Sequence, residues 1–174
     1  MSAIMNEINI NPEGMTPFFQ VHSEKRVRFL WDKLDKNIVT DLIHTIFRDS
    51  QLTMTVLVGY SFELNFVKEK TGIGKIFTIT NWKELSIDSE DHEFQFVLAQ
   101  IERIKKDELI NYCMKIKNGH PQAYITFNNE SSLLYVSTDV MDIVSQDKNS
   151  ISALKKKYHG IVDVYREAKH SRGI

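Results

Sequence analysis

The clearest pattern in the chain is an alternation of apolar and polar residues over positions 52–66. Every even position in this stretch is apolar, and the odd positions are polar or glycine apart from Leu57. Because successive side chains of a strand point to opposite faces, the pattern predicts β structure with one buried face and one wetter face. The apolar positions are Leu52, Met54, Val56, Val58, Tyr60, Phe62, Leu64 and Phe66.

Gly59 interrupts this stretch and leaves two arrangements open. A two-residue hairpin loop at Gly59 is disfavoured, because it would set Val58 opposite Ser61 and mix apolar with polar side chains on one face. A three-residue loop of residues 59–61 instead sets Val58 opposite Phe62 and keeps the buried face apolar. One long strand bent at Gly59 also fits the pattern.

Helical spacing of apolar residues runs through residues 24–49, and Ser23 precedes them as an N-cap. Asp and Asn, at residues 35 and 37, are unfavourable inside a helix, so a division into two helices is also possible. The apolar stripe keeps its phase across these residues, which favours one helix. The stripe consists of Val27, Leu30, Trp31, Leu34, Ile38, Leu42, Ile43, Ile46 and Phe47.

A turn, a strand and a second helix are predicted next. Residues 68–74 form a charged turn with glycine, and Phe77 alternates with Ile79 in a strand over residues 75–80. Acidic and capping residues at 88–91 favour a helix N-terminus. The helix either continues to the Asn-Gly pair at residues 118–119 or divides into two; both fit. Its first apolar positions are Phe94, Val97, Leu98, Ile101 and Ile104.

A hairpin is predicted from strands at residues 123–127 and 133–138, joined by a polar turn at residues 128–131. The register implied by this turn sets Phe127 opposite Ser132 on the core face. The opposite face then carries Tyr124 beside Tyr135, with Leu133 nearby.

Two short predictions complete the chain. Residues 140–144 are interpreted as a helical turn, and capping residues at 147–150 begin a last helix with Ile151, Leu154, Tyr158, Ile161 and Tyr165 on one face. We expect the tail at residues 170–174 to fray.

The fold class that follows is α+β, with elements in the order α-β-β-β-α-β-β-α and a largely antiparallel sheet packed by helices. Residues 1–22 are predicted to be an irregular N-terminal arm pinned by Phe18, Phe19 and Val21, because Pro12, Gly14 and Pro17 interrupt them. Residues 23–170 are predicted to be a single α+β domain.

Composition limits the partners and the compartment. With 22 basic and 23 acidic residues the formal net charge is −1, so we expect no nucleic-acid partner. No apolar run approaches the roughly 20 residues of a membrane span, so we expect no membrane partner. The single cysteine, Cys113, cannot form an internal disulfide, and residues 1–11 lack the basic start and apolar block of a secretion signal. We therefore expect a cytoplasmic protein.

No catalytic signature is present in the sequence. The six histidines include no pair at three- or four-residue spacing, which argues against a zinc site. Cys113 falls among apolar positions and is interpreted as a small buried residue. Residues 71–75, Thr-Gly-Ile-Gly-Lys, resemble a phosphate-binding loop but lack its first glycine, and they are interpreted as a hairpin turn. The lysine run at residues 155–157 is interpreted as a solvated helix face. We expect no catalytic residue, cofactor or metal.

The best candidate for a functional surface is the sheet face with Tyr124, Leu133 and Tyr135. Aromatic residues on a sheet face that no helix covers often mark a protein interface. The alternative is that a helix or the N-terminal arm covers these side chains.

The C-terminal half of this pattern resembles that of the YbjN-like proteins, whose fold is shared with class I type III secretion chaperones. The resemblance covers residues 94–168: the helix end Leu109-Ile110-Asn111-Tyr112, the strands at 123–127 and 133–139, and a closing helix. The rest of the chain matches by order of elements alone. Type III chaperones are typically shorter and distinctly acidic, whereas this chain is near neutral and carries an arm. The resemblance implies a non-enzymatic, often dimeric protein that binds other polypeptides.

The leading hypothesis is therefore a non-enzymatic protein-binding module, chaperone- or adaptor-like, whose partner is another protein or a second copy in a homodimer. The alternative in the same class is an immunity- or antitoxin-type inhibitor of a specific protein. A small-molecule-binding or enzymatic domain would need a pocket with convergent polar groups, which the sequence does not display.

Overall fold

The computed structural model describes residues 4–164, which build one antiparallel sheet of eight strands with three α-helices. The α+β class is as predicted. The strands are β1 (Arg26–Leu30), β2 (Leu52–Phe62), β3 (Asn65–Lys68), β4 (Lys83–Asp88), β5 (Gln95–Ile104), β6 (Ile125–Asn128), β7 (Ser132–Val136) and β8 (Val140–Ser145). The helices are α1 (Lys36–Phe47), α2 (Lys106–Lys117) and α3 (Lys148–Lys157).

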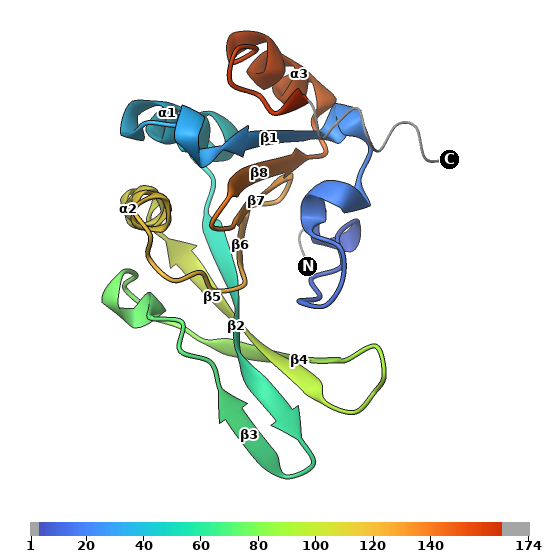
Figure 1. Ribbon diagram of the computed structural model, residues 1–174. Coiled ribbons are helices and arrows are strands. Elements are labelled where there is room, and N and C mark those ends of the chain that lie inside the picture. The colour runs from blue at the N-terminus through green and yellow to red at the C-terminus, as the bar shows by residue number, and fades with distance from the viewer. Residues whose placement is uncertain (1–3, 165–174) are drawn as a thin grey trace.

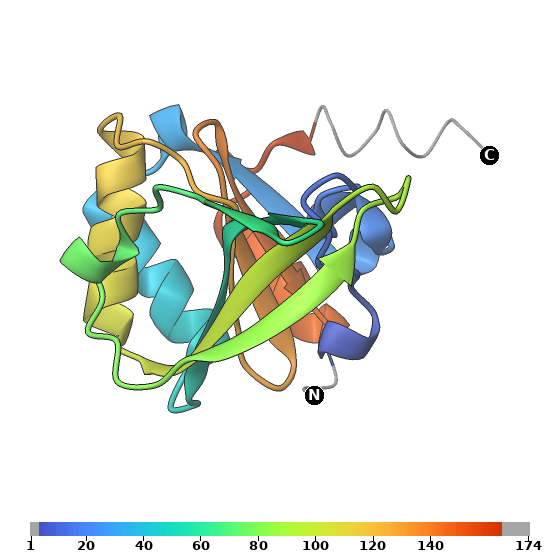
Figure 2. The ribbon, with the colours of Figure 1, turned by 90° about the horizontal axis from the view of Figure 1, so that it is seen from below.

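The strands follow the order β1-β8-β7-β6-β2-β5-β4 across the sheet, and β3 pairs with the second half of β2 (Figure 1). Helices α1 and α2 lie on one side of this sheet, and the N-terminal arm lies on the other (Figures 1 and 2). The sheet therefore has a helix side and an arm side, and each carries its own hydrophobic cluster.

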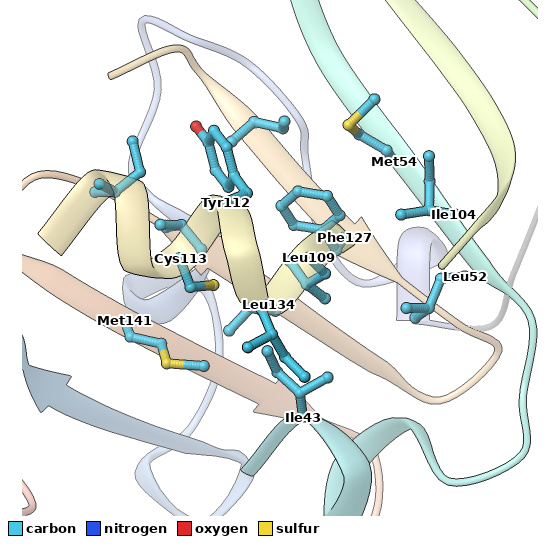
Figure 3. Packing of buried hydrophobic residues seen from close by; sticks show 14 of the residues in the cluster. Ile43, Leu52, Met54, Ile104, Leu109, Tyr112, Cys113, Phe127, Leu134 and Met141 are labelled. Atoms are coloured by element: carbon cyan, nitrogen blue, oxygen red, sulfur yellow. The ribbon is translucent and has the colours of Figure 1, made fainter. Parts of the chain in front are cut away.

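The helix-side core is organised around α2 (Figure 3). The ring of Phe127 on β6 lies 5.8 Å from that of Tyr112 and 5.6 Å from that of Phe77, measured between centroids. Cys113 on the same helix is fully buried, as predicted, and burial raises the pKa of its thiol. This residue is a packing element of the core.

The arm seals the opposite face. Ile4, Ile8 and Ile10 are buried there, and Phe18 is completely buried. Three short 3₁₀ helices, at Ile4–Asn6, Pro17–Gln20 and Ser23–Lys25, are the regular structure of this region. The burial of Phe18 agrees with the expectation that this residue pins the arm.

The bent-strand arrangement of β2 is the one observed, and the three-residue loop at residues 59–61 is wrong. Val58 is the extra residue of a bulge, because Leu57 pairs with Leu98 while Gly59 pairs with Val97. A bulge moves the following side chains to the other face, so the core phase of β2 ends at Val58. The strand then continues to a tight turn before β3.

Gly59 itself is required by the close approach of β3. A Cβ atom at this position would lie 2.4 Å from the Phe66 ring and 2.5 Å from the Val67 carbonyl oxygen. No larger residue fits without moving the β3 backbone.

The predicted helix over residues 24–49 is wrong in its first half. Residues 26–30 form β1, in which Val27 and Phe29 face the helix-side core while Arg26 and Arg28 contact the arm. A spacing of four residues fits both a helix and a strand, which produced the false stripe. Asp35 is the N-cap of α1, and its carboxylate accepts a hydrogen bond from the Ile38 amide.

Three further assignments are corrected. Residues 95–104, predicted as helix, form β5, and residues 140–144, predicted as a helical turn, lie in β8. Both strands are buried on their two faces, so they lack the alternation that marks a half-exposed strand. Residues 75–80, predicted as a strand, are irregular, although Phe77 enters the core.

Other predictions are confirmed. Helix α2 ends before Asn118 and Gly119, and Asp147 caps α3. The hairpin of β6 and β7 is present, with its register two residues from the predicted one, since Phe127 pairs with Leu134. A shift of two keeps every side chain on its predicted face. Tyr165 and the tail at residues 170–174 lie outside the described residues.

Candidate functional site

The surface predicted from the sequence lies beneath the arm. Leu133 is completely buried, Tyr135 is 6% exposed and Tyr124 is partly buried. The two tyrosine rings are neighbours, as expected, with centroids 5.8 Å apart. All three residues belong to the arm-side cluster with Ile4 and its neighbours. Coverage by the arm, the alternative that the sequence left open, is the arrangement found.

A buried ion pair accompanies them on the same face. The Arg28 guanidinium donates two hydrogen bonds to the Asp142 carboxylate, at 2.6 and 2.7 Å. The Phe18 ring lies over Arg28 at 4.2 Å and over Arg26 at 4.4 Å. These charges already have partners on the chain, so the pair holds the arm against the sheet and offers nothing to a ligand.

A hollow of about 220 Å³ lies between the C-terminal end of α1, the β6–β7 turn and the start of α3. Its polar groups bind one another: Ser132 Oγ donates to Ser145 Oγ at 2.9 Å, and Asn129 Nδ2 donates to Ser50 Oγ at 2.8 Å. This hollow is therefore a hydrogen-bonded junction between elements.

A larger hollow is a groove of about 780 Å³ beside β3, which we name the β3 groove. One of its lining strands, β3, lies at the end of the sheet remote from α1 and α3 (Figure 1). Its apolar lining includes Val58, Phe66, Ile73, Ile79 and Trp82. A groove of this size and lining can accept an apolar side chain of a partner or a small ligand.

One wall of the groove is the segment at residues 68–75, which contains the Thr-Gly-Ile-Gly-Lys sequence. The predicted hairpin turn at this sequence is wrong. Gly72 has a φ of 66°, and Ile73–Lys75 form a 3₁₀ helix that leads into an irregular stretch. Residues 69–82 thus cross the helix side of the sheet as a strap, from β3 to β4.

Glu108 at the start of α2 holds this strap. Its Oε1 accepts hydrogen bonds from the Thr78 amide at 3.0 Å and from the Thr78 hydroxyl at 2.6 Å. Farther along, the Asn81 amide group donates to the Glu102 carbonyl at 2.8 Å. The strap is therefore tied to α2 and to β5.

We expect Glu108→Gln to lower the free energy of unfolding by about 0.5–1 kcal/mol at neutral pH, because the carboxylate is only partly buried. Burial raises the pKa of Glu108, but the hydrogen bonds from Thr78 and Lys105 lower it more, to below its ordinary value. A lowered carboxyl pKa stabilises the fold above the unfolded pKa of about 4.3, and this stabilisation is lost as pH falls through the folded-state pKa.

Urea unfolding at several pH values tests this expectation. The difference between the native chain and Glu108→Gln should shrink on acidification. Glu63→Gln, at the exposed β2–β3 turn, is the matched control and should show no difference at any pH. A Glu108→Gln deficit that persists unchanged to low pH would contradict the role of the charge.

Exposed apolar side chains gather around the β2–β3 hairpin. Of the seven large hydrophobic residues that are exposed among residues 4–164, five lie on this hairpin or at the groove. Leu64 at the turn is fully exposed, and the others are about half exposed. These five are Phe62, Leu64, Phe66, Val67 and Trp82, and we name them the hairpin patch.

Sequence reasoning placed Phe62, Leu64 and Phe66 in the core and made no use of Trp82. The bulge beside Gly59 turns Phe62 to the other face of the sheet, and the turn that follows places Leu64 in solvent and Phe66 on β3. Two signals could have found the patch. A glycine inside a strand often marks a bulge, and Trp82 is the one aromatic residue of a polar stretch, Thr80 to Glu84.

Among residues 4–164 there is no cluster of three or more side chains of the kinds that bind metals, and no helix is long and apolar enough to cross a bilayer. The lysine run of α3 is partly engaged within the chain. Lys157 pairs with Asp41 at 2.7 Å, and Lys155 donates to the Ser23 carbonyl.

Comparison of the chain with models of protein families, with curated proteins and with solved structures gave no match.

Proposed function

We propose that this chain is a non-enzymatic protein-binding module, a chaperone or adaptor of the cytoplasm, and that the hairpin patch is its contact surface. The observation that carries the proposal is the grouping of five exposed apolar side chains at one end of the sheet. Exposed apolar side chains grouped in this way are typical of a protein interface.

The construction of the patch supports the same proposal. The hairpin projects beyond β6, and all four residues of β3 are exposed, so a partner can reach both faces and the outer edge of the hairpin. The chain closes its other apolar face with its own arm, at Ile4, Ile8, Ile10 and Phe18. When a protein buries one apolar face under its own chain and leaves a second apolar surface exposed, the exposed surface is typical of a site of association.

Co-purification from the native host tests this function. The tagged full chain is compared with Leu64→Ser and Trp82→Ser, and the recovered proteins are identified and quantified by mass spectrometry. We expect a defined partner in stoichiometric amount with the native chain and its loss from both variants. Each substitution replaces an exposed side chain, so the urea midpoint should stay unchanged.

Met15→Ser is the matched control. Met15 is an apolar residue of the arm, 60% exposed and outside the hairpin patch. It should leave the partner bound. Equal recovery with all three variants would reject the hairpin patch as the contact surface.

A further inference from the structure

We propose that the partner of this surface is a second copy of the chain, whose acidic β4–β5 loop, residues 88–94, enters the β3 groove in a two-fold dimer. The inference rests on the proposed function, because it names the partner of the same surface. Charge, exposure and the position of the two sites on the sheet carry it.

The rim of the groove has free positive charge. Lys68, Lys70 and Lys75 line it, and none of their side-chain amines has a hydrogen-bond or ion-pair partner within residues 4–164. The groove also has two carboxylates, Glu69 and Glu84, so its lysines outnumber them. Glu84 accepts a hydrogen bond from the Trp82 indole at 3.2 Å. Glu69 lies beside Tyr60, and the pKa of Tyr60 is raised by burial and, to a smaller extent, by this carboxylate. The rim of the groove therefore favours an anionic occupant.

The β4–β5 loop supplies such an occupant. It contains four carboxylates, Asp88, Glu90, Asp91 and Glu93, and no lysine or arginine. All four side chains are exposed.

The loop is also ordered before any contact. Asp91 Oδ1 accepts hydrogen bonds from the Ser89 hydroxyl at 2.6 Å and from the Glu93 amide at 3.1 Å. The Phe94 ring anchors the loop against Tyr60 and Phe96. A loop ordered in this way loses little conformational freedom when it docks.

The loop cannot fill the groove of its own copy. β4 joins the groove residue Glu84 to Asp88 at the start of the loop, and these four residue steps hold the two roughly 13 Å apart at about 3.3 Å per residue. The hairpin lies beside the loop, since Ser61 and Asp88 both pair with Gln95. Basic, apolar and acidic surfaces thus adjoin at one end of the sheet. A two-fold axis through the apolar part sets each loop against the other copy's groove.

Sedimentation velocity on the full chain over a range of concentrations is the first test. We expect a monomer–dimer equilibrium that shifts toward monomer at high salt, because salt shortens the screening length from about 10 Å at 0.1 M to about 3 Å at 1 M. A monomer at every concentration and salt would overturn the inference.

Charge exchange is the decisive test. Lys68→Glu with Lys70→Glu makes both groove and loop acidic, and Asp88→Lys with Glu90→Lys and Glu93→Lys makes the loop basic like the groove. Each variant alone should weaken the dimer roughly tenfold or more, because like charges then meet. Mixed in equal amounts, the two variants should form a heterodimer of native affinity, since every groove then meets a loop of opposite charge. A mixture that stays monomeric would overturn the inference.

The control for the groove variant carries the same change of net charge elsewhere. Lys36→Glu with Lys156→Glu alters exposed residues of α1 and α3 and should leave the dimer unchanged. Equal urea midpoints confirm that all variants are folded. The two proposals fail differently. A monomer that still recovers another protein through Leu64 keeps the proposed function and rejects the self-association, whereas a monomer without any Leu64-dependent partner rejects both.

Discussion

Arg28→Ala and Asp142→Ala are each expected to destabilise the fold by about 3–5 kcal/mol, because each leaves a buried charge without its partner. The side chains of Arg28 and Asp142 are 5% and 0% exposed, and they are joined by the two short hydrogen bonds between β1 and β8. Water cannot replace the lost partner while Phe18 covers the site.

Removing both charges together should have a much smaller effect. Burial raises the pKa of Asp142 even though Arg28 acts to lower it, so the loss of hydration outweighs the attraction between the two groups. The double variant Arg28→Met with Asp142→Leu is therefore expected to be as stable as the native chain or more so.

Urea unfolding of the single and double variants measures these differences. The exposed pair of Lys157 and Asp41 is the matched control, and Asp41→Ala should cost less than about 1 kcal/mol. Single variants at Arg28 or Asp142 that cost no more than this control would mean that water reaches the pair in solution.

The same pair shows why the sequence predicts some strands and misses others. β1, β5 and β8 are covered on both faces, by the helix-side core and by the arm. A strand with two dry faces has no alternation of apolar and polar residues, so β5 was read as a helix and β8 as a turn. The elements found correctly, such as the β6–β7 hairpin and α3, carry turn or capping residues whose action is local.

The candidate site depends on features that no local pattern specifies. Phe62 leaves the helix side because the bulge at Val58 changes the face of the strand, and only the pairing with β5 defines that bulge. The strap crosses the sheet because Glu108 binds Thr78, thirty residues earlier in the chain. The burial of Tyr135 likewise follows from the distant arm. Contacts far apart in sequence thus decide which apolar residues are exposed.

Phe18→Ala is expected to destabilise the fold by about 3–5 kcal/mol, the range for removing a fully buried aromatic ring. Phe18 is completely buried and its ring covers the guanidinium groups of Arg26 and Arg28. Truncation removes this packing and admits water to the ion pair, which loosens the hold of the arm on the sheet. Urea unfolding gives the total loss, and limited proteolysis within residues 4–22 shows whether the arm opens first.

Phe19→Ala separates this effect from a general loss of aromatic contacts. Phe19 is the adjacent residue, only partly buried, and its ring lies farther from Arg28, at 4.9 Å against 4.2 Å for Phe18. It should cost about 1 kcal/mol. If Phe18→Ala costs no more than Phe19→Ala, the arm does not hold its place in solution. Tyr124, Leu133 and Tyr135 would then be open to a partner, and the hairpin patch would no longer be the leading surface. A large and selective loss at Phe18 instead makes the arm part of the core and leaves association to the hairpin.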